Sequence, residues 1–177
     1  MDPHDAGDRV DRGDRVFAAE VARLMARARA IVEPVASLER ARLQYGVIPY
    51  RRGKDCIEIM LITSRSTRRW IVPKGWPLAR KPSREVARLE ALEEAGLEGT
   101  IGKRAVGSFH YHKRLKDGSV VLCRVDVFAF EVGRELDTWL ECNERQRRWF
   151  DAKRAIKLVR EPELKALIGA FVRRLET

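Results

Sequence analysis

The chain has 177 residues, 45% of them hydrophobic, which is enough to bury one sizeable core, so we expect a single main domain. Its 36 lysines and arginines against 26 acids give a formal net charge of +10, which favours a polyanionic partner without choosing among nucleic acid, polyphosphate and acidic membrane. The three cysteines lack CxxC spacing, which argues against a disulfide framework and against a thiolate metal site. No apolar run reaches about 20 residues, which argues against a membrane span. A soluble, cytoplasmic protein is therefore expected.

The first 40 residues are predicted to be an appendage. Residues 1–14 mix Asp, Arg and Gly with almost nothing to bury, which is typical of a disordered tail. From residue 15 to 31, apolar side chains recur at helical spacing with arginines between them, so we expect a helical extension over residues 15–40. Such a basic helix can lie on a membrane or on nucleic acid, but packing on its own domain or in a homodimer is commoner.

The pattern changes after residue 41. Short runs rich in Ile, Val, Tyr and Trp predict strands at residues 45–51, 57–63 and 70–72. The segment from Pro82 to Ala95 is rich in Ala, Leu, Glu and Arg and stops at Gly96, a suitable residue to end a helix. This segment is the strongest predicted helix of the chain.

Strands and helices also alternate in the last third of the chain. The pair Asp117-Gly118 marks a hairpin turn between strands expected at residues 107–115 and 120–132. A strand at residues 148–150 and helices at about residues 152–159 and 161–175 follow. The predicted fold class is therefore α+β around one sheet.

The strongest helix carries a cluster of acids. Glu90, Glu93 and Glu94 fall within an arc of about 100° on an ideal helix, and the residue four positions after Glu90 is another glutamate instead of a base. One interpretation is a solvated acidic face. The other is a site for Mg²⁺ or Mn²⁺ on an inward-turned patch, because these ions accept a few carboxylates and complete their coordination with water and phosphate oxygens.

The residues around this cluster carry a resemblance. Residues 70–77 read Trp-Ile-Val-Pro-Lys-Gly-Trp-Pro, and residues 90–97 read Glu-Ala-Leu-Glu-Glu-Ala-Gly-Leu. Together they resemble the Nudix box, G-x5-E-x7-R-E-U-x-E-E-x-G-U with U apolar, and the closest pattern is that of diphosphoinositol polyphosphate and diadenosine polyphosphate hydrolases. The positions that match are Gly75, Glu90, Ala91, Glu93, Glu94, Gly96 and Leu97. The resemblance spans about residues 47–171 and implies a Nudix domain over residues 41–177, a mixed curved sheet sandwiched between helices (α/β/α).

Two positions depart from the box. Lys81 stands in the place of its first glutamate, and Leu89 stands in the place of its arginine. Family arginines at the second place orient the glutamates that bind metal, so Leu89 removes that support unless Lys81, Arg88 or Lys74 supplies it. A reduced rate or a reduced metal affinity is the expected effect.

The resemblance implies a pyrophosphohydrolase that uses Mg²⁺, with Mn²⁺ as an alternative, held by Glu90, Glu93 and Glu94. The proton of the attacking water would pass to Glu94 first or Glu90 second, with Glu141 and Glu144 as other choices. Phosphate would be bound by cationic and small residues: Arg51, Arg52, Ser64, Arg65, Lys74 and Gly75. His110 and His112 alternate on a strand and are expected to contact substrate or solvent rather than metal.

The sequence is compatible with three functions. The first is hydrolysis of a diphosphate linkage in a small, highly anionic molecule: a dinucleoside polyphosphate, a diphosphoinositol polyphosphate or a nucleoside diphosphate derivative. The second is a nucleotide- or phosphate-binding module of the same fold, weakened in catalysis by Leu89. The third, a nucleic-acid binder, rests on charge alone, since no recognised nucleic-acid motif accompanies the arginines.

Overall fold

A computed structural model describes residues 40–177. The tail expected at residues 1–14 and the helical extension expected at residues 15–40 lie outside this range, apart from the last residue of the extension. The elements in chain order are β1 (Arg42–Arg52), β2 (Ile57–Thr63), β3 (Trp70–Ile71), β4 (Lys74–Gly75), α2 (Ser83–Ala95), β5 (Leu97–Arg114), β6 (Val120–Glu135), β7 (Arg147–Asp151), α3 (Ala152–Leu158) and α4 (Pro162–Glu176). Within these residues, no helix has the length and apolar character that a membrane crossing requires.

The strands form one mixed sheet of seven strands in the order β3-β2-β1-β6-β5, with β4 paired to β1 and β7 paired to β2. Strands β1 and β6 run parallel, from Arg42 opposite Cys123 to Tyr50 opposite Glu131, and the other pairs are antiparallel. Helices and sheet are therefore combined as the sequence predicts. The expected α+β class is confirmed.

Strand β5 is longer than its sequence predicts. It begins at Leu97, about ten residues before the expected start, although residues 99–105 are rich in Gly, Lys and Arg. This stretch pairs with the far end of β6 through register shifts between Glu98 and Gly99, and between Ile101 and Gly107. Hydrogen bonding to β6 holds these residues extended, and such pairing between distant segments is not predicted by the local propensities of the residues.

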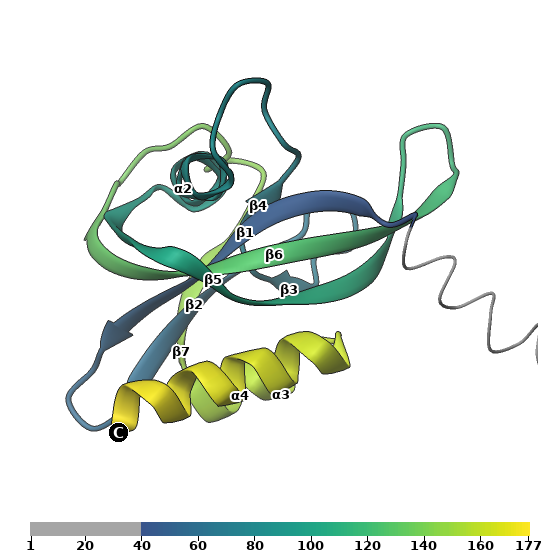
Figure 1. The fold of residues 1–177 in the computed structure, drawn as a ribbon. Coiled ribbons are helices and arrows are strands. Elements are labelled where there is room, and N and C mark those ends of the chain that lie inside the picture. Colours follow the sequence, from purple (N-terminus) through teal and green to yellow (C-terminus); the bar gives the residue numbers. More distant parts are fainter. Residues whose placement is uncertain (1–39) are drawn as a thin grey trace, which may run out of the picture. The chain divides into compact units, whose positions relative to one another are not determined.

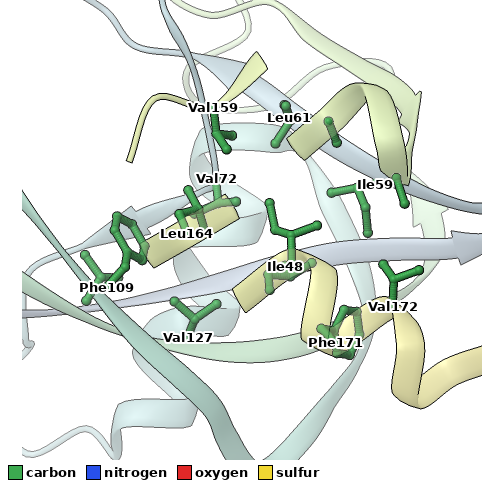
Figure 2. Close-up of a cluster of buried hydrophobic side chains, with 14 of the residues drawn as sticks. Ile48, Ile59, Leu61, Val72, Phe109, Val127, Val159, Leu164, Phe171 and Val172 are labelled. Carbon is green, nitrogen blue, oxygen red and sulfur yellow. The ribbon is translucent and has the colours of Figure 1, made fainter. Parts of the chain in front are cut away.

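Helices cover both faces of the sheet, as Figure 1 shows, with α2 on one side and α3 and α4 on the other. The alternation of side chains along β1 and β2 supplies both layers. Val47 and Met60 pack with Ala87 and Ala91 of α2, whereas Ile48 and its neighbours pack under α3 and α4. Figure 2 shows that second core, including Ile48, Ile59, Leu61, Val72, Phe109, Leu164 and Phe171. The α/β/α sandwich is confirmed.

Helix α2 lies close against the sheet because the residues on its buried face are small or short. Val86, Ala87, Ala91 and Ala95 are fully buried. The helix ends at Gly96, which takes the left-handed conformation at φ 62° and donates its N–H to Leu92 O at 2.9 Å. The chain therefore leaves the helix directly into β5, and the glutamates of the C-terminal half of α2 are held at a fixed height above the sheet.

Candidate active site

The glycine of β4, Gly75, lies against Glu90 of α2. Strand β4 is held by β1, with Lys74 opposite Gly46 and Gly75 opposite Tyr45. A Cβ atom built at Gly75 would overlap the carboxyl group of Glu90, so only a residue without a side chain leaves room for that carboxylate. The glycine at this position of the box thus has a steric reason.

Glu90 is a half-buried carboxylate without an ion-pair partner among the described side chains. Within residues 40–177, no group donates a hydrogen bond to its side chain and no base forms an ion pair with it. The pKa of Glu90 is raised to about 7, chiefly by burial and then by the negative charges of Glu94 and Glu93, while the charge of Lys74 opposes the rise. Glu90 therefore has an uncompensated charge when it is ionised.

Glu94, in contrast, is buried and bonded at both oxygens. The backbone N–H of Lys74 donates to its Oε2 at 2.9 Å, and the guanidinium of Arg145 donates to its Oε1. Burial raises the pKa of Glu94, and the charges of Lys74 and Arg145 oppose this rise. Glu93 is exposed, so the expectation that all three glutamates turn inward is wrong for Glu93. Its position, 100° along the helix from Glu94, directs it to solvent.

Arg145 is the site residue that the sequence reasoning missed. Its side chain is only 5% exposed, and its guanidinium donates to Glu94, Glu141 and, at 3.0 Å, Thr63 O. The residues expected to replace the box arginine behave differently. Lys81 is exposed, and Arg88 bonds Glu85 at 2.6 and 3.0 Å. Of the expected candidates, Lys74 alone contacts Glu94, through its backbone.

Three of the expected phosphate-binding residues belong to segments next to the site: Lys74 bonds Glu94 through its backbone, and Ser64 and Arg65 lie in a turn that contacts residues 141 and 144. The ammonium of Lys74 lies 5.1 Å from the ring centre of Tyr111, and burial lowers its pKa while Glu94 opposes that shift. Arg65 contacts Glu141 at 3.3 Å and Glu144 at 3.4 Å, on the segment that carries Arg145. Ser64 bonds Thr67 Oγ1 at 2.7 Å within the turn that presents Arg65. Gly75 is the fourth residue of this group.

The structure does not bring the two remaining arginines to the glutamates. Lys74 is opposite Gly46, and Arg51 follows Gly46 by five residues along β1, a distance of about 17 Å at the rise of a strand. Arg51 bonds Glu58 at 2.7 Å, and Arg52 donates to Leu175 O at 3.3 Å at the end of α4. Their partners are elsewhere in the fold.

The two histidines are also separated from this site. His110 bonds Glu163 of α4, with its Nδ1 3.0 Å from Glu163 Oε2. His112 is exposed.

The donor set fits a hard divalent cation, although the carboxylates do not form a closed cage. Among the side chains of residues 40–177, no group of three or more His, Cys, Asp and Glu is arranged to hold a metal ion. Among those side chains, no lysine or arginine forms an ion pair with Glu90 or Glu93. Glu94 keeps oxygen lone pairs beyond the two that accept its hydrogen bonds. An ion that takes few carboxylates and otherwise water or phosphate oxygens matches this arrangement.

Comparisons with known proteins identify relatives of the chain. No model of a known protein family matches the chain. Nudix hydrolase 13 of Arabidopsis thaliana, a mitochondrial protein, is 31% identical over 151 residues, which cover 75% of this chain and 74% of the relative. The diphosphoinositol polyphosphate phosphohydrolase 3-beta of Bos taurus is 32% identical over 112 residues, covering 62% of this chain and 64% of the relative.

A solved structure supports the fold alone. The C. elegans Ap4A hydrolase in a binary complex matches with a TM-score of 0.59 at 21% identity, covering 77% of this chain and 98% of that chain. The shared architecture agrees with a mixed sheet between helices, with α2 carrying the glutamates.

Proposed function

The chain belongs to the Nudix hydrolase family, and we propose that it hydrolyses a diphosphate linkage in a small, highly anionic molecule with Mg²⁺ as cofactor. The observation that carries this proposal is Glu90. A carboxylate packed against Gly75, with a pKa raised to about 7 and two more glutamates beside it, is unfavourable for folding unless a cation binds there. Mn²⁺ has the same ligand preference and is the alternative.

The residues divide the chemistry among them. Glu90, Glu93 and Glu94 would hold the metal, which supplies neutralisation of the diphosphate charge and a bound water of lowered pKa. Glu94 or Glu90 would accept the proton of the attacking water, since burial raises the pKa of both carboxyl groups and so favours proton uptake. Lys74 and Arg65 bind phosphate oxygens, with Ser64 and the backbone at Gly75 beside them.

The proposed substrate class follows from the charge and from two relatives. The bovine relative is named for diphosphoinositol polyphosphate, and the C. elegans neighbour is named for Ap4A. Both names describe substrates with several phosphates, and a net charge of +10 suits such anions better than a singly charged ester. Dinucleoside polyphosphates and diphosphoinositol polyphosphates are therefore proposed ahead of nucleoside diphosphate derivatives.

The test is a phosphate-release screen with and without Mg²⁺ across dinucleoside polyphosphates, inositol pyrophosphates, ADP-ribose and nucleoside triphosphates. We expect turnover that requires Mg²⁺ and falls at least 100-fold in Glu94→Gln and in Glu90→Gln. Glu85→Gln is the matched control, because Glu85 is on the same helix and bonds only Arg88 there. Full turnover in Glu94→Gln would show that the site is assigned wrongly.

A phosphate-binding module without turnover is the second candidate. It is favoured by the two hydrogen bonds that occupy Glu94 and by the lack of a three-carboxylate cage in the part of the chain that the structure describes. Calorimetric titration of the same compounds separates the two functions. Binding at micromolar concentration without Mg²⁺-dependent release in any substrate would support the module and reject the hydrolase.

A further inference from the structure

Helix α2 provides no base to its own inward glutamates. Its arginine nearest in sequence, Arg88, is bonded to Glu85, and Leu89 occupies the place where the Nudix box has an arginine. Lys81, just before the helix, is exposed. A buried carboxylate on this helix must therefore be stabilised by groups from other elements.

Arg145 meets this requirement from outside the helix. Its guanidinium has all three nitrogens engaged: Nη2 with Glu94 Oε1, Nε with Glu141 Oε2, and Nη1 with Thr63 O at 3.0 Å. The side chains of Arg145 and Glu94 are 5% and 9% exposed. A planar fork fixed by three acceptors leaves its partner carboxylate little freedom to rotate.

The segment that carries Arg145, residues 136–146, is attached to the site at both ends. Leu136 N–H donates to Gly96 O at 2.8 Å and Glu141 N–H donates to Glu93 O at 3.2 Å, so the segment is fastened to the end of α2. At its other end, Gln146 N–H bonds Thr63 Oγ1 at 2.9 Å and Thr63 N–H bonds Gln146 O at 2.8 Å. Figure 1 shows this segment, in light green, passing beside α2 between β6 and β7.

We propose that Arg145 is the positioning residue that orients Glu94, in the role that the box assigns to the arginine replaced here by Leu89. The inference rests on the proposed function, since it concerns the same metal site. Arg145 and the Lys74 N–H each use one acceptor position of Glu94, so each carboxylate oxygen keeps a further lone pair, in a fixed direction, for a cation. Glu141 accepts from Nε of Arg145 and so holds the guanidinium in place beside Glu94.

The experiment measures Mg²⁺ affinity of the full chain, by the Mg²⁺-dependent rise in its thermal midpoint, beside kcat and KM for the best substrate. Arg145→Ala is expected to lower Mg²⁺ affinity about 10- to 100-fold. It should also lower kcat by a larger factor than it changes KM. Arg145→Lys keeps the positive charge but loses the planar guanidinium, so its Mg²⁺ affinity is expected to lie between those of wild type and Arg145→Ala. Adding Leu89→Arg to Arg145→Ala should recover most of the lost affinity, since it returns a guanidinium to the box position.

Arg147→Ala is the matched control for a purely structural effect. Arg147 lies two residues away and donates to Ala95 O at 2.6 Å and Leu136 O at 2.7 Å, so it fastens the same helix and segment without contacting Glu94. Its replacement should lower the thermal midpoint and leave Mg²⁺ affinity within about twofold. An equal loss of affinity in Arg147→Ala would reduce Arg145 to a structural residue.

The outcomes separate this inference from the proposed function. Wild-type protein that neither binds Mg²⁺ nor releases phosphate overturns the proposed function. Wild-type protein that binds Mg²⁺ no better than folded Arg145→Ala overturns the role of Arg145 alone. A double variant with Leu89→Arg that binds Mg²⁺ no better than Arg145→Ala overturns the equivalence of the two positions.

Discussion

Replacing Glu90 with glutamine should stabilise the metal-free protein while abolishing its metal response. The pKa of this carboxyl group rises from 4.5 to about 7 on folding, so the folded state holds the proton more tightly than the unfolded state does. The stability contributed by the proton is present below about pH 4.5 and is lost as the pH rises toward 7. At pH 8 the ionised Glu90 therefore destabilises the metal-free fold.

The magnitude follows from the shift. A rise of about 2.5 pKa units corresponds to about 3.4 kcal/mol, and solvent screening of a carboxylate that is only partly buried lowers this to about 1–2 kcal/mol. Glu90→Gln keeps the shape and removes the charge, so at pH 8 its free energy of unfolding should exceed that of wild type by about 1–2 kcal/mol. At pH 4 the two proteins should be nearly equal, because wild-type Glu90 is then largely protonated in both states.

The assay is urea unfolding in EDTA at pH 4 and pH 8, repeated at pH 8 with Mg²⁺. Glu93→Gln is the matched control, because it makes the same chemical change at an exposed position of the same helix and should change stability by less than about 0.5 kcal/mol. Mg²⁺ should stabilise wild type more than Glu90→Gln. A Glu90→Gln protein that is less stable than wild type in EDTA at pH 8, or equally stabilised at both pH values, would refute the reasoning.

The remaining predictions concern packing around the site and the core. Gly75→Ala should lower Mg²⁺ affinity at least tenfold, measured by the shift in thermal midpoint, because its methyl group displaces the Glu90 carboxylate; unchanged affinity would contradict the packing described. Gly96→Ala should cost about 1–2 kcal/mol in urea unfolding, since φ is 62° and the new Cβ atom would lie 2.7 Å from Arg147 Nη1; an unchanged midpoint would contradict this. Ile168→Ala, at a fully buried position of α4, should lower the free energy of unfolding by about 2–5 kcal/mol in the same measurement. A loss below about 1 kcal/mol would show that the surrounding core closes over the cavity and would contradict this estimate.

Local spacing explains why most of the fold was predictable. Strand β2 and helix α2 have hydrophobic patterns and end residues that suffice to place them within a residue or two. The i, i+4 spacing of Glu90 and Glu94 also places both glutamates on one face of the helix, since helix geometry requires it. The first half of β5 has no such pattern, because its extended form depends on pairing with β6.

Arg145 could not be identified in this way. It is 51 residues from Glu94 in sequence and belongs to the run Arg145-Gln146-Arg147-Arg148, in which nothing local distinguishes one arginine from another. The structure separates them by their hydrogen bonds: Arg145 donates to the carboxylates of Glu94 and Glu141, whereas the hydrogen bonds of Arg147 go to backbone carbonyl groups. Arg148 is exposed. Tertiary contacts decide the role of each, and a single sequence does not contain those contacts.

Glu94 has an arginine partner and Glu90 has none, and this difference bears on function. The segment 136–146 brings an arginine to Glu94 and none to Glu90, although the two carboxylates belong to one helix face. An arginine on Glu90 would relieve its unfavourable burial, but it would also compete with a cation for the same oxygens. Fixing one carboxylate and leaving its neighbour uncompensated yields a site that is oriented in advance and whose free energy falls when a cation binds. This arrangement supports the proposed metal-dependent hydrolysis over a helix that only packs against its sheet.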